Sequence, residues 1–429
     1  MRTKTNFASV ALVALASLGV LKATPLEAQL ANASATALGL SGNNTATVRE
    51  FGAISVNPAG LGMPGSGFSL AILPLQLRSG LDPITLSDIN DFAGQVIPSA
   101  TKEDWLQRVV TAGGQSGTFG LDVSEIALTM GNIGLQLSTV VGSDINLPAG
   151  MVEAALFGNA GRTGSAADLS LAGAAVTGFA ISTAGLSFGI PMTSATGSMA
   201  FGATVKYSVG HGMAVGRSAT GSVQSSPIRV DVDFPLVITS EDEDPINTGS
   251  GIGLDLGFML QQDRLSIGAS VQNVVNTFAW DAAKLGYRPI SAEFSQGTSS
   301  SQSSEEAYSG APANLKALVE AQTFKPSIQL GAAIDVSSDF TVSADVHKRF
   351  SDEGIALTPN FHMGAGAEFR GLKVIHLRGG AAIITDGIQY SGGASLILGP
   401  LNFSAAAALQ TGDLGENFLG QFTLSFGGR

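Results

Sequence analysis

The stretch FTVSADVHKRF, residues 340–350, alternates apolar and polar side chains. Successive side chains of a β-strand point to opposite sides of the sheet, so the two kinds separate onto two faces. The apolar face carries Phe340, Val342, Ala344 and Val346, and the other carries Thr341, Ser343, Asp345, His347 and Arg349. One face suits lipid and the other suits water, which is typical of a strand in a transmembrane β-barrel.

The same alternation is repeated along the chain, with short polar or Gly/Pro turns between the segments. Six segments fill the C-terminal part: residues 340–350, 361–370, 374–384, 388–398, 401–410 and 418–426. Eight further candidate strands precede them: residues 67–77, 118–129, 133–141, 176–190, 198–210, 251–261, 265–276 and 326–336. The sequence therefore predicts an all-β fold, a transmembrane antiparallel up-and-down barrel of about fourteen strands. A soluble β-sandwich is the alternative.

Residues 228–237 also alternate, and counting them would make the number of strands odd. Bacterial barrels have an even number of strands, short periplasmic turns and long outer loops. With fourteen strands, the long connections at residues 79–117, 143–175, 211–250 and 277–325 all fall on one side. We therefore expect residues 228–237 to form strand-like structure inside an outer loop.

The outer loops carry further local signals. Residues 86–110 have helical spacing and predict two short amphipathic helices, and residues 146–160 predict another. Residues 297–306 contain a glycine followed by a Ser/Gln run, which we interpret as a flexible linker.

The N-terminal residues predict export. Arg2 and Lys4 precede an apolar stretch at residues 7–20 and a plausible cleavage site at residues 26–28, so residues 1–28 are expected to be a signal peptide. The apolar stretch is shorter than the roughly 20 residues that a spanning helix needs. We therefore expect a barrel in an outer membrane of the Gram-negative type, in contact with outer-membrane lipid.

The composition argues against several classes of function. The chain has no cysteine, which removes thiolate catalysis, disulfides and zinc-thiolate sites. Its formal net charge of −12 argues against a nucleic-acid partner, because phosphate binding needs a basic face. We expect no enzyme activity, no cofactor and no metal; an outer-membrane lipase is the enzyme alternative.

The segment after the predicted signal peptide resembles part of a known family. It runs from Ala35-Thr36-Ala37-Leu38-Gly39-Leu40-Ser41-Gly42 through Arg49 and Glu50 to Asn57-Pro58-Ala59-Gly60-Leu61, and then directly into the first strand. This order resembles the N-terminal hatch of FadL-type transporters of long-chain fatty acids and of the related PorV-like barrels. Residues 364–368 and 377–380 are similar to those relatives too. The resemblance implies an outer-membrane barrel at residues 66–429 that is plugged by residues 29–65.

In the resemblance, Asn57, Pro58 and Ala59 lie within the plug. Proline fixes its own φ and pushes the preceding residue towards extended geometry, so the tripeptide can form a fixed kink. The Asn side chain can then bond to exposed backbone groups. An ordinary loop before a strand is the alternative.

Charged side chains on the polar faces of consecutive strands form two expected groups. The upper cluster, near the outer end of the barrel, contains Asp345, His347, Arg349 and His362, and the lower cluster contains Glu368, Arg370, His376 and Arg378. A tight turn at residues 371–373 would set Glu368 opposite His376. The histidines fall on two levels, so we favour ion-pair networks over a metal site. We expect the lower cluster to hold the plug through Arg49 and Glu50; the alternative is that these residues only fill the lumen.

Two functions fit these expectations. The first is passive uptake of a hydrophobic, fatty-acid-like small molecule through the plugged lumen, collected by apolar outer-loop residues. The candidates are Trp105, Leu106, Val109, Leu147, Met151, Leu156 and Phe157, which could instead only pack the loops together. The second function is a PorV-like barrel that conducts nothing and binds secreted proteins at the cell surface.

Overall fold

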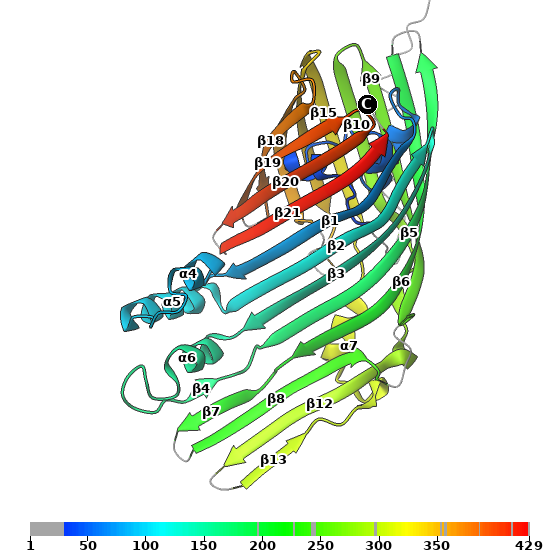
Figure 1. Cartoon of the computed structure of the whole chain (residues 1–429). Coiled ribbons are helices and arrows are strands. Elements are labelled where there is room, and N and C mark those ends of the chain that lie inside the picture. Colours follow the sequence, from blue (N-terminus) through cyan, green and yellow to red (C-terminus); the bar gives the residue numbers. More distant parts are fainter. Residues whose placement is uncertain are drawn as a thin grey trace, which may run out of the picture.

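The computed structural model describes residues 30–194, 197–225, 228–241, 246–295, 298–351, 354–355, 358–385, 387–412 and 415–427. The expected signal peptide, residues 1–28, lies outside the described residues. Figure 1 shows a tall, twisted barrel, with the C-terminus at one end and the long loops at the other.

Fourteen of the described strands form one closed antiparallel ring, because β1 pairs both with β2 and with the last strand, β21. The predicted barrel and its strand count are therefore confirmed. The ring follows chain order: β1 (Ser69–Asp82), β2 (Gln115–Met130), β3 (Ile133–Leu147), β5 (Ala175–Ser194), β6 (Gly197–Arg217), β9 (Gly249–Gln262), β10 (Leu265–Asn276), β15 (Ser327–Ser337), β16 (Phe340–Arg349), β17 (Phe361–Phe369), β18 (Ile375–Ile384), β19 (Gly387–Leu398), β20 (Leu401–Gly412) and β21 (Gly415–Gly427).

The alternation in these strands separates the exterior from the lumen as expected. In β16, the side chain of Val346 is 40 % exposed and faces outward, whereas its neighbour Asp345 is 2 % exposed. The same holds in β19, where Leu396 is exposed and Ser395 is buried. A closed ring leaves no unpaired strand edge, so the backbone is satisfied within the wall and the exterior can be apolar.

An outward extension of the sheet is built from the long loops. It contains β4 (Leu169–Ser170), β7 (Gly221–Ser225), β8 (Ile228–Thr239), β11 (Ala279–Trp280), η2 (Ala282–Lys284), β12 (Leu285–Ser295), β13 (Thr298–Gln302), β14 (Glu306–Ala307) and η3 (Tyr308–Gly310). Strand β8 pairs with β7, β12 and the outer end of β6. The prediction that residues 228–237 belong to an outer loop is confirmed.

The interpretation of residues 297–306 as a flexible linker is wrong. Residues 298–302 form β13, which pairs with β12 from Ser291 to Ser295. The hydrogen bonds of a β-ladder join main-chain groups, so a segment of exposed serines and glutamine can form a strand once a partner strand is available. That partner, β12, was not among the predicted strands.

The outer loops also contain short helices: α4 (Leu86–Asp91), α5 (Ser99–Ala112), α6 (Ala149–Phe157) and α7 (Ala313–Ala321). The two helices predicted within residues 86–110 are confirmed as α4 and α5. The helix predicted at 146–160 is shorter, because β3 continues to Leu147 and Pro148 then forms the N-cap of α6. Among the described residues, no helix has both the length and the apolar character needed to cross a membrane.

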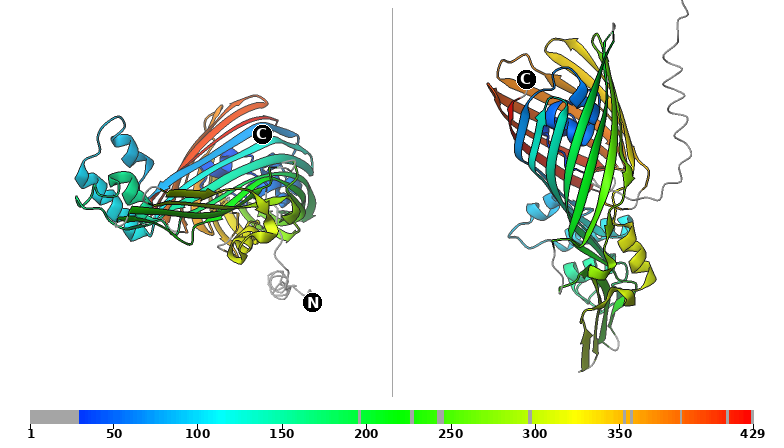
Figure 2. Two further views of the ribbon diagram at one scale, coloured as in Figure 1. Left: turned by 90° about the horizontal axis from the view of Figure 1, so that it is seen from below. Right: turned by 90° about the vertical axis from the view of Figure 1, so that its right-hand side faces the viewer.

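Residues 30–63 fold inside the ring (Figure 2) and are called the plug here. They contain α2 (Ala35–Gly39), α3 (Glu50–Val56) and η1 (Pro58–Gly62). An apolar cluster joins the second half of the plug to the wall, with Ala53, Ala59 and Leu61 against Ala200 and Met259. The plug is therefore packed into the barrel as a core, although most lumen-facing wall residues are polar.

Candidate functional site

The Asn57-Pro58-Ala59 turn is hydrogen-bonded both within the plug and to the wall. Asn57 is fully buried, and its side-chain oxygen accepts a hydrogen bond from the Ala59 amide at 3.2 Å. Its side-chain nitrogen donates to the carbonyl oxygen of Thr45 within the plug at 3.0 Å and to that of Phe258 on β9 at 3.2 Å. One side chain therefore holds the turn, a second plug segment and the wall together.

Two wall glycines allow this turn to lie directly on the strands. A Cβ atom on Gly202 of β6 would lie 2.1 Å from the carbonyl carbon of Pro58, and one on Gly257 of β9 would lie 2.2 Å from Oδ1 of Asn57. Real Cβ atoms do not approach other atoms so closely, so glycine is required at both positions. Sequence alone did not single out these two glycines, since the chain contains 55.

The first half of the plug is held by hydrogen bonds at the level of the upper cluster. Asp345 accepts a bond from the Thr45 amide at 2.8 Å, and His362 bonds through Nε2 to Oδ1 of Asn43 at 3.1 Å. The Ser343 hydroxyl donates to the Asn43 carbonyl at 2.5 Å. Residues 43–45 are therefore attached to β16 and β17 by polar contacts rather than by apolar packing.

The structure brings three members of the upper cluster together. The rings of His347 and His362 stack with centroids 4.5 Å apart and planes 14° from parallel. His347 also lies 3.3 Å from the Asp345 carboxylate. Arg349 is buried two residues further along β16 and donates through Nε to the Ser351 carbonyl.

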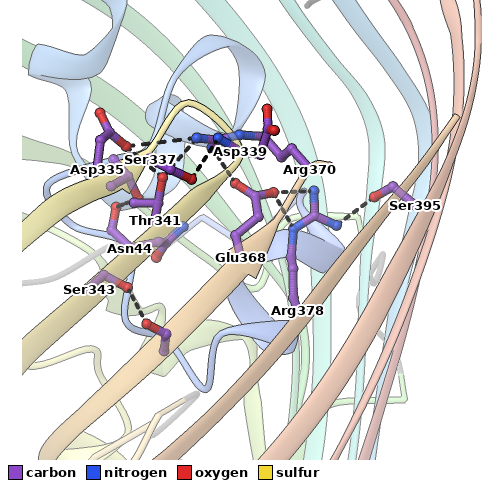
Figure 3. A network of polar contacts seen from close by, with 12 residues as sticks. Asn44, Asp335, Ser337, Asp339, Thr341, Ser343, Glu368, Arg370, Arg378 and Ser395 are labelled. Atoms are coloured by element: carbon purple, nitrogen blue, oxygen red, sulfur yellow. Dashed lines mark hydrogen bonds and ion pairs between the residues drawn. The ribbon is translucent and has the colours of Figure 1, made fainter. Parts of the chain in front are cut away.

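The lower cluster forms an ion-pair network on neighbouring strands (Figure 3). Glu368 pairs with Arg370 at 2.8 Å and with Arg378 at 2.7 Å, and Arg378 also donates to the Ser395 hydroxyl. The expectation that Glu368 faces His376 is wrong, because its partner in the ladder is Arg378. Strand β17 ends at Phe369 and β18 begins at Ile375. Their connection is therefore longer than the predicted turn, which shifts the register between the two strands.

Arg49 and Glu50 face the same inner space as the lower cluster, beside α3. Arg49 donates to the Val48 carbonyl at 2.8 Å and lies 3.3 Å from the sulfur of Met259. Hydrogen bonds join the plug to Phe258 on β9 and to Asp345 and His362 of the upper cluster. Docking of the plug through the lower cluster stays a prediction.

The plug divides the described lumen into two cavities. The outer chamber has a volume of about 820 Å³ and extends to the outer strand ends at Asp82 and Thr118. The inner chamber has a volume of about 580 Å³ and extends to the opposite ends at Gly399 and Gly427. Among the described residues, Asn44 alone lines both cavities. Asn44 therefore lies between the two cavities.

The apolar outer-loop residues pack against each other. Trp105, Leu106 and Val109 are at most 4 % exposed and form a small core with Val152 of α6, and Phe92 meets Trp105 edge to face. These three side chains are closed to a ligand, so for them the packing alternative holds. Leu147, Leu156 and Phe157 are partly buried against this core, and Met151 is half-buried.

Residues 185–189 read Gly-Leu-Ser-Phe-Gly and match the Gly-x-Ser-x-Gly pattern of serine hydrolases. That pattern works at a sharp turn between a strand and a helix, which exposes the serine. Here it lies inside β5, and Ser187 is fully buried and bonded to Thr204 at 2.7 Å. The match is therefore a strand sequence and not a nucleophile elbow.

The closed ring of fourteen antiparallel strands has the fold of FadL-type outer-membrane β-barrels. By sequence, the chain belongs to the family described as "F plasmid transfer operon, TraF, protein", whose model matches residues 100–346. No curated protein matches the chain in sequence.

Solved structures of outer-membrane channels share this fold. The CymD monoaromatic hydrocarbon channel is 12 % identical, with a TM-score of 0.50 over 93 % of this chain and 98 % of that one. The toluene transporter TodX of Pseudomonas putida is 10 % identical, with a TM-score of 0.48 over 94 % and 99 % of the two chains. At such identities the likeness concerns the fold alone.

Proposed function

We propose that this protein is an outer-membrane channel for passive uptake of a hydrophobic small molecule, with the plug as its gate. The observation that carries the proposal is the pair of chambers on the two sides of the plug, both of which are lined by Asn44. A barrel that served only as a scaffold would have no need of a chamber at each end of its lumen. The hydrocarbon channels with the same fold support the proposal by analogy.

The lining of the outer chamber suits a molecule with an apolar body. Leu30, Leu38 and Val56 of the plug and Ile384 and Leu419 of the wall all border it. Burial of apolar surface in such a chamber is favourable by about 25 cal/mol per Å². A chamber of this volume also falls within the usual range of ligand pockets.

Passage requires the first half of the plug to move, because it fills the lumen between the chambers. The hydroxyl oxygens of Ser41 on the plug and Ser391 on β19 lie 2.7 Å apart. The chain has no cysteine, so the double variant Ser41→Cys/Ser391→Cys places its only two thiols at this contact. We expect oxidation to join plug and wall and to abolish uptake of a labelled monoaromatic hydrocarbon by cells, and we expect a reductant to restore it.

A matched control places the crosslink within the wall. Thr183 on β5 and Ser208 on β6 have hydroxyl oxygens 2.6 Å apart, and both lie on barrel strands. The variant Thr183→Cys/Ser208→Cys should keep its uptake under both conditions. Equal uptake by the plug-crosslinked variant with and without reductant would contradict a moving plug.

The PorV-like alternative gives a different result in the same cells. A barrel that conducts nothing would show no uptake above cells that lack the protein, whatever the state of the crosslink. Exported proteins retained by the purified barrel would then identify it as a partner-binding protein.

A further inference from the structure

The wall of the outer chamber is rich in side-chain amides. Gln76, Gln272, Gln329, Gln389, Gln410 and Asn417 border it from six different strands. Serine and threonine hydroxyls, among them Ser116, Thr118 and Thr411, lie between them. Amides and hydroxyls donate and accept hydrogen bonds without carrying a charge. A ligand in this chamber therefore meets neutral polar groups on most sides.

The few charges of the chamber balance. Its described lining contains two arginines, Arg78 and Arg349, and two aspartates, Asp82 and Asp122, together with His347 and His362, which are counted as neutral here. Arg78 and Asp122 pair at 2.8 Å, with side chains that are 14 % and 3 % exposed. Asp345, which accepts the hydrogen bond from the Thr45 amide of the plug, adds a further negative charge next to the chamber. No net positive charge is thus available to an anion.

This balance disfavours ionised ligands. A carboxylate or an ammonium that leaves water loses its hydration and needs a matched charge in return. A hydroxyl, ether or carbonyl oxygen needs only a hydrogen bond, which the amides supply. The apolar residues of the plug and wall would take up the rest of the molecule.

We infer that the outer chamber selects an uncharged amphiphile, a molecule with an apolar chain or ring and neutral hydrogen-bonding oxygens, and rejects the ionised carboxylate of the same skeleton. The inference rests on the proposed function, since it names the class of molecule that the channel admits. It departs from the fatty-acid-like ligand expected from the sequence, because a fatty acid is ionised at neutral pH.

The test compares three probes that differ only in the terminal group: 4-phenylbutan-1-ol, 4-phenylbutanoate and 4-phenylbutylamine. Binding to the full barrel in lipid nanodiscs is measured by equilibrium dialysis at pH 7, with empty nanodiscs as the blank. We expect the alcohol to bind about tenfold more tightly than either ion. Tighter binding of the carboxylate, or no binding of the alcohol above the blank, would overturn the inference.

A charge introduced into the wall should remove the preference for the alcohol. Gln410 is partly exposed to the outer chamber, and Gln410→Lys adds a cation with no added partner. We expect the carboxylate to bind this variant about tenfold more tightly than it binds the wild type. The matched control is Gln261→Lys, because Gln261 lines the inner chamber and should leave the preference for the alcohol unchanged. An unchanged preference in Gln410→Lys would contradict selection by this wall.

The two proposals fail separately. If the carboxylate binds more tightly than the alcohol while the plug crosslink still blocks uptake, the proposed channel is supported and the proposed selectivity is contradicted. If the alcohol binds more tightly than the ions but the crosslink has no effect on uptake, the chamber is a selective binding site and the proposal that the plug moves is contradicted.

Discussion

Replacement of Gly202 by valine is expected to undock the second half of the plug. The new side chain would begin at a position only 2.1 Å from the Pro58 carbonyl carbon, and main-chain atoms cannot rotate away. Overpacking of this kind typically costs about 1–3 kcal/mol. Hydrogen exchange of the amides in residues 50–63 should therefore change from slow to fast in Gly202→Val.

A second glycine on the same strand provides the control. A Cβ atom on Gly212 of β6 would meet nothing within 4 Å, so Gly212→Val should leave the exchange of residues 50–63 as slow as in the wild type. The barrel of both variants should still resist unfolding by detergent at room temperature, since the ring of strands is intact. Equal protection of the plug in Gly202→Val and in the wild type would mean that the plug is not seated on β6 as described.

The second large effect is expected at Lys206, a fully buried lysine on the lumen side of β6. Its ammonium lies 2.6 Å from Oδ1 of Asp255 and 2.6 Å from Oδ1 of Asn273. The Lys206 and Asp255 side chains are 0 % and 5 % exposed. The variant Lys206→Met leaves a buried carboxylate without its cation, which typically costs about 3–5 kcal/mol. Urea unfolding of the barrel in detergent should show a loss of this size.

The loss at Lys206 should be recovered when the partner is neutralised. In the wild type, the main-chain N–H of Asn273 donates a hydrogen bond to Asp255. In Lys206→Met/Asp255→Asn, the side-chain oxygen of the new asparagine can still accept this bond. Most of the lost stability should return in this double variant. Arg229→Met removes two exposed ion pairs in the outer extension, with Asp231 and Glu293, and should change the stability little. A small effect of Lys206→Met would show that the buried pair is not isolated from water.

The barrel could be predicted from the sequence because its signal is local and repeated. The alternation in residues 340–350 fixes which side chains face outward, and the parity of the strands placed residues 228–237 in an outer loop. Both expectations depend only on the two-residue period and on the lengths of the connections. Asp345, His347 and His362 were grouped correctly because they are neighbours in register on adjacent strands.

Other features depend on contacts that no local pattern encodes. β12 and β13 are strands because they pair with each other, although residues 298–302 are mostly serine. Glu368 bonds to Arg378 because of the length of one turn, and a shift of one or two residues changes every pairing after it. The glycines that receive the plug differ from the other glycines only in what lies opposite them. The lumen position of Lys206 could have been predicted from the sequence. Lys206 lies two residues from both Thr204 and Ser208, so all three share the polar face of their strand.

We expect residues 30–63 to seal an otherwise open lumen, and ion conductance across a planar bilayer measures that seal. The wild-type barrel should be almost silent, because its two chambers are separated by the plug. A variant that lacks residues 30–63, shown to be folded by its resistance to detergent, should give large and steady conductance steps. A wild-type barrel that conducts as well as the deletion variant, or a folded deletion variant that stays silent, would contradict the account.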